Sequence, residues 1–91
     1  MHQPRVLIVE DSLVSALAAE RVIGQSLPGA RIFRAQSCFE ARLLLQMYDF
    51  DVSVLDVHLP DGSGLDLVRY ILGVKPSANI ILMTADPAEE L

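Results

Sequence analysis

The chain has 91 residues, of which 52% are hydrophobic and 21% are charged, proportions that indicate one small globular domain and exclude a disordered tail. Twelve acidic residues against seven basic ones give a formal net charge of −5 at pH 7, which argues against direct contact with nucleic acid. The single cysteine, Cys38, excludes an intramolecular disulfide and fits a cytoplasmic location. No apolar run is long enough for a membrane span or for the core of a signal peptide.

The first part of the chain predicts a buried strand followed by a helix. Residues 6–9 are a β-branched apolar run, which is typical of a strand covered on both faces in a parallel sheet. Asp11 and Ser12 can cap a helix that we expect to run to about Ser26. Its apolar residues recur at helical spacing, namely Leu13, Val14, Leu17, Val22 and Ile23.

A second strand and helix follow. Residues 30–35 contain an apolar centre flanked by arginines, and we expect this strand at an edge of the sheet. Ser37 and Glu40 have the spacing of a capping box, which predicts a helix to about Tyr48.

The remaining pattern repeats this alternation. We expect a third strand over residues 52–55 that ends at Asp56, turn residues at 60–64, a third helix over 65–72 and a fourth strand over 79–83. Strict alternation of buried strands with helices predicts the α/β class, as a three-layer, doubly wound parallel sheet with helices on both faces.

The end of the sequence has the signals of a helix start. Asp86 suits an N-cap, Pro87 the first helical position and Glu89 the third. The sequence stops at Leu91, before a helix could be stable by itself. We therefore expect residues 1–91 to be one domain that is incomplete at its C-terminus, with a frayed, capped terminus as the alternative.

Acidic residues follow two of the predicted strands. Glu10 and Asp11 follow the first strand and Asp56 ends the third, and sites in open α/β sheets form at the carboxyl ends of strands. If these strands are neighbours, the carboxylates repel one another and favour a hard divalent cation such as Mg²⁺. Thr84 ends the fourth strand on the same edge, where its hydroxyl can donate to a phosphoryl oxygen. Taken singly, acidic residues in these places are more often helix caps or parts of solvated loops, and a threonine at a strand end is simply a good β-former.

Three blocks of the sequence resemble a bacterial response-regulator receiver domain: residues 6–12, 54–64 and 80–85. The middle block is the most specific, because proline and glycine follow its aspartate by four and eight residues. The resemblance covers the whole chain and implies a flavodoxin-like fold with sheet order 2-1-3-4-5. This chain would form the order 2-1-3-4, without the fifth strand and the last helix.

The resemblance implies a phosphoacceptor domain of a two-component system. Asp56 would accept a phosphoryl group from a sensor histidine kinase or a phosphotransfer protein, by in-line displacement. Mg²⁺ would be bound by the side chains of Asp11 and Asp56, by the backbone carbonyl of His58, and by Glu10 through water. Thr84 would hydrogen-bond to the phosphoryl group and act as the conformational switch. Such a chain would catalyse at most its own phosphorylation and dephosphorylation, and would not be a metabolic enzyme.

Glycines at positions 62 and 64 would give the backbone freedom to turn beside this site.

One family feature is missing from the sequence. The family has a lysine after its fifth strand, whereas the single lysine here, Lys75, precedes the fourth strand and belongs at the opposite end of the sheet, about 17 Å from Asp56. Because the family's lysine is missing, the alternative is a degenerate receiver that acts as a phosphorylation-independent interaction module. An aspartyl phosphatase would need a second aspartate where His58 stands, and a nucleotide-binding domain would need a glycine-rich loop after the first strand.

The apolar sequence of the expected fourth strand favours self-association of the chain. Residues 79–83 would form an apolar sheet edge, and part of the first helix would lack cover. We expect the 91-residue chain to be marginally stable or to associate through this edge. Sedimentation velocity combined with thermal unfolding tests this, and a compact monomer that melts cooperatively would contradict it.

Overall fold

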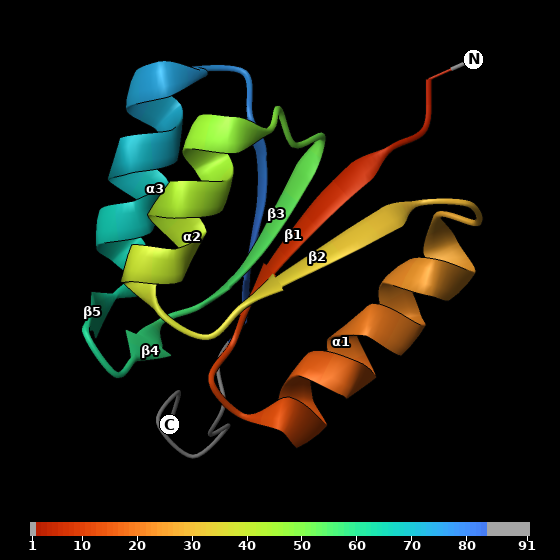
Figure 1. The fold of residues 1–91 in the computed structure, drawn as a ribbon, viewed down its shortest axis with the longest axis horizontal. Helices are drawn as coiled ribbons and strands as arrows, with labels where there is room; N and C mark the ends of the chain where they lie inside the picture. Colours follow the sequence, from red (N-terminus) through yellow and green to blue (C-terminus); the bar gives the residue numbers. More distant parts are fainter. Residues whose placement is uncertain (1, 84–91) are drawn as a thin grey trace.

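A four-stranded parallel sheet forms the centre of the computed structural model, which describes residues 2–83 (Figure 1). Its strands lie in the order β2-β1-β3-β6. Their bounds are β1 (Arg5–Val9), β2 (Arg31–Ala35), β3 (Val52–Asp56) and β6 (Asn79–Met83). Strand β6 is the fourth strand expected from the sequence, so the predicted order of the first four strands is confirmed.

Helices cover both faces of this sheet, as the alternating pattern predicted. Helix α1 (Leu13–Ser26) lies on one face, and helices α2 (Cys38–Met47) and α3 (Gly64–Val74) lie side by side on the other (Figure 1). None of the helices in the described part of the chain is long and apolar enough to cross a membrane.

The side chains of β1 alternate between the two helical layers. Leu7 and Val9 belong to the cluster that includes residues of α2 and α3, whereas Val6 and Ile8 pack with Ile23 of α1. Both sets are fully buried, which explains why the strand is apolar at every position. Each such side chain contributes roughly 1.5–3 kcal/mol to stability.

Helix α1 begins and ends where the sequence predicted, and part of its apolar surface lacks cover, as expected. Ile23 is buried, whereas the other four apolar residues at that spacing are exposed: Leu13, Val14, Leu17 and Val22. The face towards the sheet carries the small residues Ala16 and Ala19 together with Ile23. Small side chains let a helix lie close to a sheet, and hydrophobicity alone does not mark such a face.

The predicted helix caps are confirmed. The Ser12 hydroxyl accepts a hydrogen bond from the Ser15 N–H at 3.4 Å. The Ser37 hydroxyl accepts from the Glu40 N–H at 3.1 Å, and the Glu40 carboxylate accepts from the Gln36 N–H at 2.9 Å. Ser37 is therefore the N-cap of α2, and Glu40 reaches back past it to the N–H of Gln36 and not to that of Ser37, as it would in a capping box.

The segment predicted only as a turn contains a short hairpin. Strands β4 (His58–Leu59) and β5 (Gly62–Ser63) pair antiparallel, with His58 opposite Ser63. The turn-forming residues that the sequence shows are therefore the tip and the second strand of this hairpin, directly before α3.

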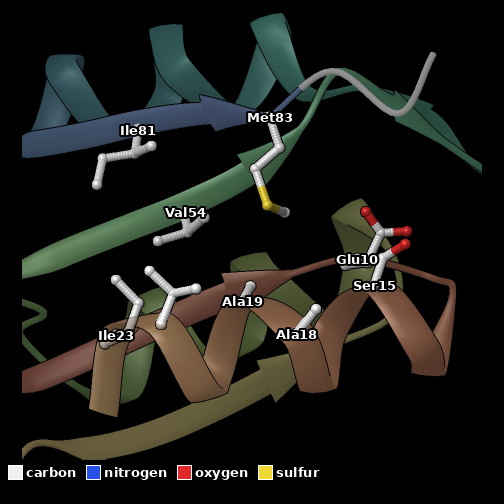
Figure 2. A pocket seen from close by; sticks show the side chains of 9 residues that line it. Glu10, Ser15, Ala18, Ala19, Ile23, Val54, Ile81 and Met83 are labelled. Atoms are coloured by element: carbon white, nitrogen blue, oxygen red, sulfur yellow. The ribbon is translucent and has the colours of Figure 1, made fainter. Parts of the chain in front are cut away.

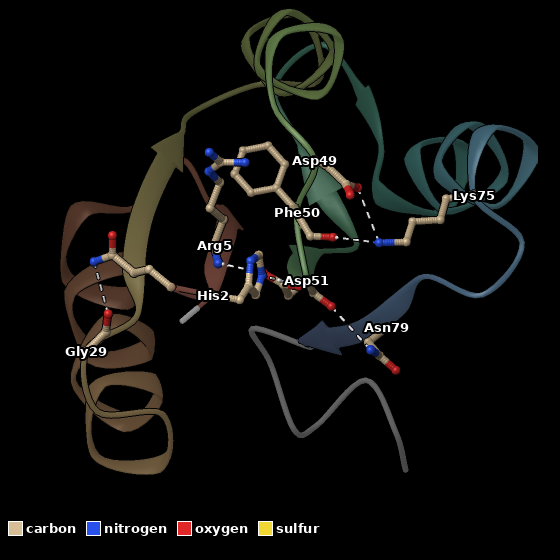
Figure 3. A network of polar contacts seen from close by, with 9 residues as sticks. His2, Arg5, Gly29, Asp49, Phe50, Asp51, Lys75 and Asn79 are labelled. Carbon is tan, nitrogen blue, oxygen red and sulfur yellow. Dashed lines mark hydrogen bonds and ion pairs between the residues drawn. The ribbon is translucent and has the colours of Figure 1, made fainter.

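A polar network joins three strands at the amino ends of the sheet (Figure 3). The Asp51 carboxylate accepts a hydrogen bond from the Arg5 N–H at 2.8 Å, and His2 Nε2 lies 2.9 Å from it. The Asn79 side chain donates to the Asp51 carbonyl at 3.2 Å. The hydrogen bond from Arg5, followed by the contact with His2, lowers the pKa of Asp51. One residue thus connects the starts of β1, β3 and β6.

Replacing Asp51 with alanine should lower the free energy of unfolding by about 1 kcal/mol at neutral pH, because the Arg5 N–H loses its partner. A lowered native pKa means that this contribution is present above the unfolded-state pKa, about 3.9, and is lost as the pH falls through the native value. Urea unfolding at a series of pH values should therefore show the two proteins converging below about pH 4.

Asp49→Ala is the matched control for this prediction. Asp49 has a side chain that is 79% exposed and pairs with Lys75 at 3.2 Å, an ion pair that contributes little. Equal destabilisation by both substitutions, or a loss for Asp51→Ala that persists in acid, would contradict the prediction.

Candidate functional site

Three carboxylates converge at the carboxyl edge of the sheet. Val9 is in register with Leu55, and this pairing of β1 with β3 brings the next residues, Glu10 and Asp56, side by side. Oxygen atoms of Glu10, Asp11 and Asp56 lie within 4.8 Å of one another. The three acidic residues that the sequence placed at this edge are therefore brought together.

Two of these carboxylates are removed from water. Glu10 is 6% exposed and Asp56 is 3% exposed, whereas Asp11 is exposed. Burial raises the pKa of Glu10 to about 7, the hydrogen bond from the Ser12 N–H opposes this rise, and Asp56 adds to it. A carboxylic acid with a raised native pKa favours the folded state below its ordinary value of 4.5, and this contribution is lost as the pH rises towards 7.

This arrangement fits a hard divalent cation. The cluster offers oxygen ligands alone, and their negative charges lie close together with two of the three buried. A bound cation would offset both the repulsion and the desolvation of the carboxylates. Mg²⁺ favours one or two protein carboxylates together with water and phosphate oxygens, which matches the mixture of buried and exposed acids here.

Two cavities adjoin the acidic cluster. One, of about 550 Å³, is largely polar; its lining includes Glu10, Asp11 and Arg34. The other, of about 440 Å³, has Glu10 and Ser15 at one end and apolar side chains such as Ile81 along its length (Figure 2). Glu10 lines both cavities, and Asp11 lines the polar one.

Backbone groups of the following loop hold Asp56 in place. The His58 N–H donates to Asp56 Oδ1 at 3.1 Å, and the Gly64 N–H donates to the Val57 carbonyl at 2.8 Å. The side chain of His58 is exposed on β4, two residues after Asp56. The start of α3 is thus attached directly to the end of β3.

The glycine at 64 has a different role from the one expected. Among residues 2–83 only Gly29 has a positive φ, so Gly64 does not need unusual backbone freedom. A Cβ atom at Gly64 would instead overlap the carbonyl group of Asp56. The glycine eight residues after the aspartate is needed for this close approach of α3, which spacing alone did not reveal.

Lys75 lies where the sequence placed it, away from the acidic cluster. Its Nζ donates to Asp49 Oδ1 at 3.2 Å and to the Phe50 carbonyl at 3.5 Å (Figure 3). Both partners precede β3, whereas Asp56 ends that strand. Thr84, the remaining predicted site residue, lies outside the described residues, as do the helix signals at Asp86, Pro87 and Glu89.

Known proteins resemble this chain in both sequence and fold. The family model of the response regulator receiver domain matches residues 6–91. The chain belongs to this receiver family.

Curated relatives carry the same domain in longer proteins. The response regulator protein PilR of Pseudomonas aeruginosa is 38% identical over 85 residues, which are 93% of this chain and 19% of that protein. The aerobic respiration control protein ArcA of Escherichia coli is 32% identical over 83 residues, which are 91% of this chain and 33% of that protein. The chain thus spans a third or less of these two relatives.

Solved receivers share the fold. TrrA of Thermotoga maritima, in complex with Mg²⁺ and BeF, superposes with a TM-score of 0.83 at 28% identity, over 94% of this chain and 73% of that chain. The non-phosphorylated HemR receiver domain of Leptospira biflexa gives a TM-score of 0.78 at 31% identity, over 97% of this chain and 71% of that chain. The flavodoxin-like fold that the sequence predicted is therefore confirmed.

Gly64→Ala should lower the free energy of unfolding by more than about 2 kcal/mol, because the new methyl group overlaps the Asp56 carbonyl and forces α3 away. Gly73→Ala, in the same helix, is the control. Nothing lies within 4 Å of a Cβ there, so alanine should stabilise α3 by about 0.5–1 kcal/mol. Urea unfolding measures both effects, and a neutral Gly64→Ala variant would contradict the steric argument.

Proposed function

We propose that this chain is a cytoplasmic phosphoacceptor domain of a two-component system, with Asp56 as the residue that is phosphorylated. The observation that carries the proposal is the convergence of three carboxylates, two of them buried, at the carboxyl edge of the sheet. Membership of the receiver family supports it, as does the complex of the similar protein TrrA with Mg²⁺ and BeF.

In this proposal some of the acidic residues bind Mg²⁺ directly and one binds it through water. The side chains of Asp11 and Asp56 and the backbone carbonyl of His58 are the proposed direct ligands, and Glu10 acts through water. The cation supplies positive charge between these carboxylates and the oxygens of the incoming phosphoryl group. Burial beside Asp56 already disfavours the ionised form of Glu10, which supports a place for cationic charge there.

The donor in this proposal is a phosphohistidine on a sensor histidine kinase or a phosphotransfer protein. An oxygen of the Asp56 carboxylate forms a bond to phosphorus while the phosphorus–nitrogen bond breaks, and the electron pair leaves with the histidine ring. The His58 N–H restricts rotation of the Asp56 carboxylate by its hydrogen bond at 3.1 Å, and such positioning lowers the barrier. Thr84 then hydrogen-bonds to the phosphoryl group and changes the conformation of the domain.

A single experiment tests the chemistry. The protein is incubated with Mg²⁺ and an acyl phosphate, a small-molecule donor whose carboxylate is the leaving group, and its intact mass is measured. We expect one phosphoryl adduct in the wild type and none in Asp56→Asn, because the amide is not a nucleophile. Removing Mg²⁺ with a chelator should abolish the adduct.

Asp49→Asn is the matched control. Asp49 lies before the start of β3 and Asp56 lies at its end, so this substitution should leave the phosphoryl adduct unchanged. An adduct that survives in Asp56→Asn would show that another residue is the acceptor. No adduct in folded wild-type protein would favour the alternative, a receiver that acts by binding other proteins without phosphorylation.

A further inference from the structure

Asp61 connects two elements that are distant in the sequence. It lies in the turn between β4 and β5, and both of its carboxylate oxygens reach the first turn of α2. Oδ1 accepts from the Cys38 N–H at 2.7 Å, and Oδ2 accepts from the Phe39 N–H at 3.0 Å. Amides in the first turn of a helix have no partner within the helix, so both bonds satisfy groups that would otherwise need water.

These bonds are additional to the local cap of α2. The side chains of Ser37 and Glu40 already engage the N–H groups of Gln36 and Glu40. Asp61 engages the N–H groups of Cys38 and Phe39, which lie between them in the chain. The hydrogen bonds from Cys38 and Phe39 lower the pKa of Asp61, which keeps the carboxylate charged and the bonds strong. Asp61 therefore acts between two elements rather than within one helix.

A second contact holds the same surfaces together. The Cys38 thiol lies 3.9 Å from the Ser63 carbonyl oxygen. A Cβ atom at Gly62 would lie 3.3 Å from Cys38 Sγ, closer than ordinary packing. Strand β5 thus lies directly on the first turn of α2, and the turn that carries Asp61 cannot shift without breaking these contacts.

The β4–β5 hairpin connects the Asp61 turn to Asp56 in the acidic cluster. Its first residue, His58, pairs with Ser63 across the hairpin and donates its N–H to Asp56. The segment between Asp56 and α3 is short and is closed by the bond from the Gly64 N–H to the Val57 carbonyl. A change in the position of Asp61 therefore changes the backbone at His58, next to Asp56.

We propose that Asp61 is a positioning residue for the phosphoacceptor site: its carboxylate anchors the β4–β5 turn to α2 and thereby holds the backbone of His58 in the geometry that binds Mg²⁺. This inference rests on the proposed function, since it concerns the same site. Groups that orient metal ligands without touching the metal commonly change metal affinity by about 10–100-fold when they are removed.

The test compares Asp61→Ala with Ser37→Ala in the same protein. Both substitutions remove acceptors from the first turn of α2, but Ser37 makes no hydrogen bond to the hairpin among the contacts of the described residues. Mg²⁺ affinity is measured by titration calorimetry, and the phosphorylation rate is measured with an acyl phosphate at saturating Mg²⁺. Hydrogen exchange of the amides of residues 57–64 is followed without Mg²⁺, and urea unfolding gives the stability of each variant.

We expect Asp61→Ala to weaken Mg²⁺ binding about tenfold and to speed exchange in residues 57–64. Ser37→Ala should lower stability but leave the affinity and the exchange of this segment unchanged. Asp61→Asn retains an amide oxygen for one of the two N–H groups and should give an intermediate affinity. If Asp61→Ala fails to fold, the affinity of Asp61→Asn alone decides the question.

Wild-type Mg²⁺ affinity in folded Asp61→Ala or Asp61→Asn would overturn the inference and leave the proposed function standing, with Asp61 as a helix cap only. Equal loss of affinity in Ser37→Ala would also overturn it, because any weakening of α2 would then suffice. Failure of the wild type to bind Mg²⁺ or to accept a phosphoryl group would overturn the proposed function itself. The exchange measurement would still show whether Asp61 holds the hairpin.

Discussion

The register between β1 and β3 is the constraint on which the rest of the structure depends. Because Val9 pairs with Leu55, Glu10 and Asp56 have to emerge side by side where the two central strands end. Placing carboxylates together with little access to water is unfavourable, as the rise in the pKa of Glu10 to about 7 indicates. The fold tolerates this cost because the strands that carry these acids are the most thoroughly buried part of the molecule.

The apolar packing of the central strands therefore has two consequences. It stabilises the sheet, with Leu7 and Val9 on one face and Val6 and Ile8 on the other. It also makes the strand ends rigid, so that residues beyond them have defined positions. The polar network around Asp51 complements this packing at the opposite end, where it connects the strand starts without bringing like charges together. The Asp51 network and the acidic cluster thus lie at opposite ends of one sheet.

Sequence reasoning was most successful where one pattern had one explanation. A strand that is apolar at every position is buried only when helices cover both faces of its sheet. This requirement predicted the sheet and its helices, and the position of sites at strand ends predicted the convergence of Glu10 with Asp56. Sequence reasoning anticipated that part of α1 would lack cover, but not that small residues such as Ala19 would lie against the sheet beside Ile23. Helical spacing identified the helix, but only the packing decided which side of it faces the sheet.

The β4–β5 hairpin and the hydrogen bonds of Asp61 to α2 could not be predicted from the sequence for a different reason. A turn-rich segment predicts a turn, but pairing between two-residue strands depends on contacts that local sequence does not specify. Asp61 lies 23 residues from Cys38, and no pattern links an acid in a turn to the amides of a preceding helix. Contacts of this kind depend on the finished fold, so a long-range contact such as that of Asp61 with α2 is harder to predict than acidic residues at the ends of strands.

The loop that follows Asp56 is held by the packing of helices and by shorter-range contacts, and the two differ in how much displacement of atoms they tolerate. Packing of α2 and α3 against the sheet places whole elements, and cores tolerate substitutions that conserve volume. Metal and phosphoryl chemistry needs ligands placed to within about 0.5 Å, which packing alone does not guarantee. The close approach of α3 to Asp56 that Gly64 permits, together with the hydrogen bonds of the Asp61 carboxylate, would supply this finer control, since both interactions change steeply with distance. The segment after Asp56 is therefore held at Gly64 by close backbone packing and at Asp61 by hydrogen bonds, so its geometry depends on α2 and α3 together.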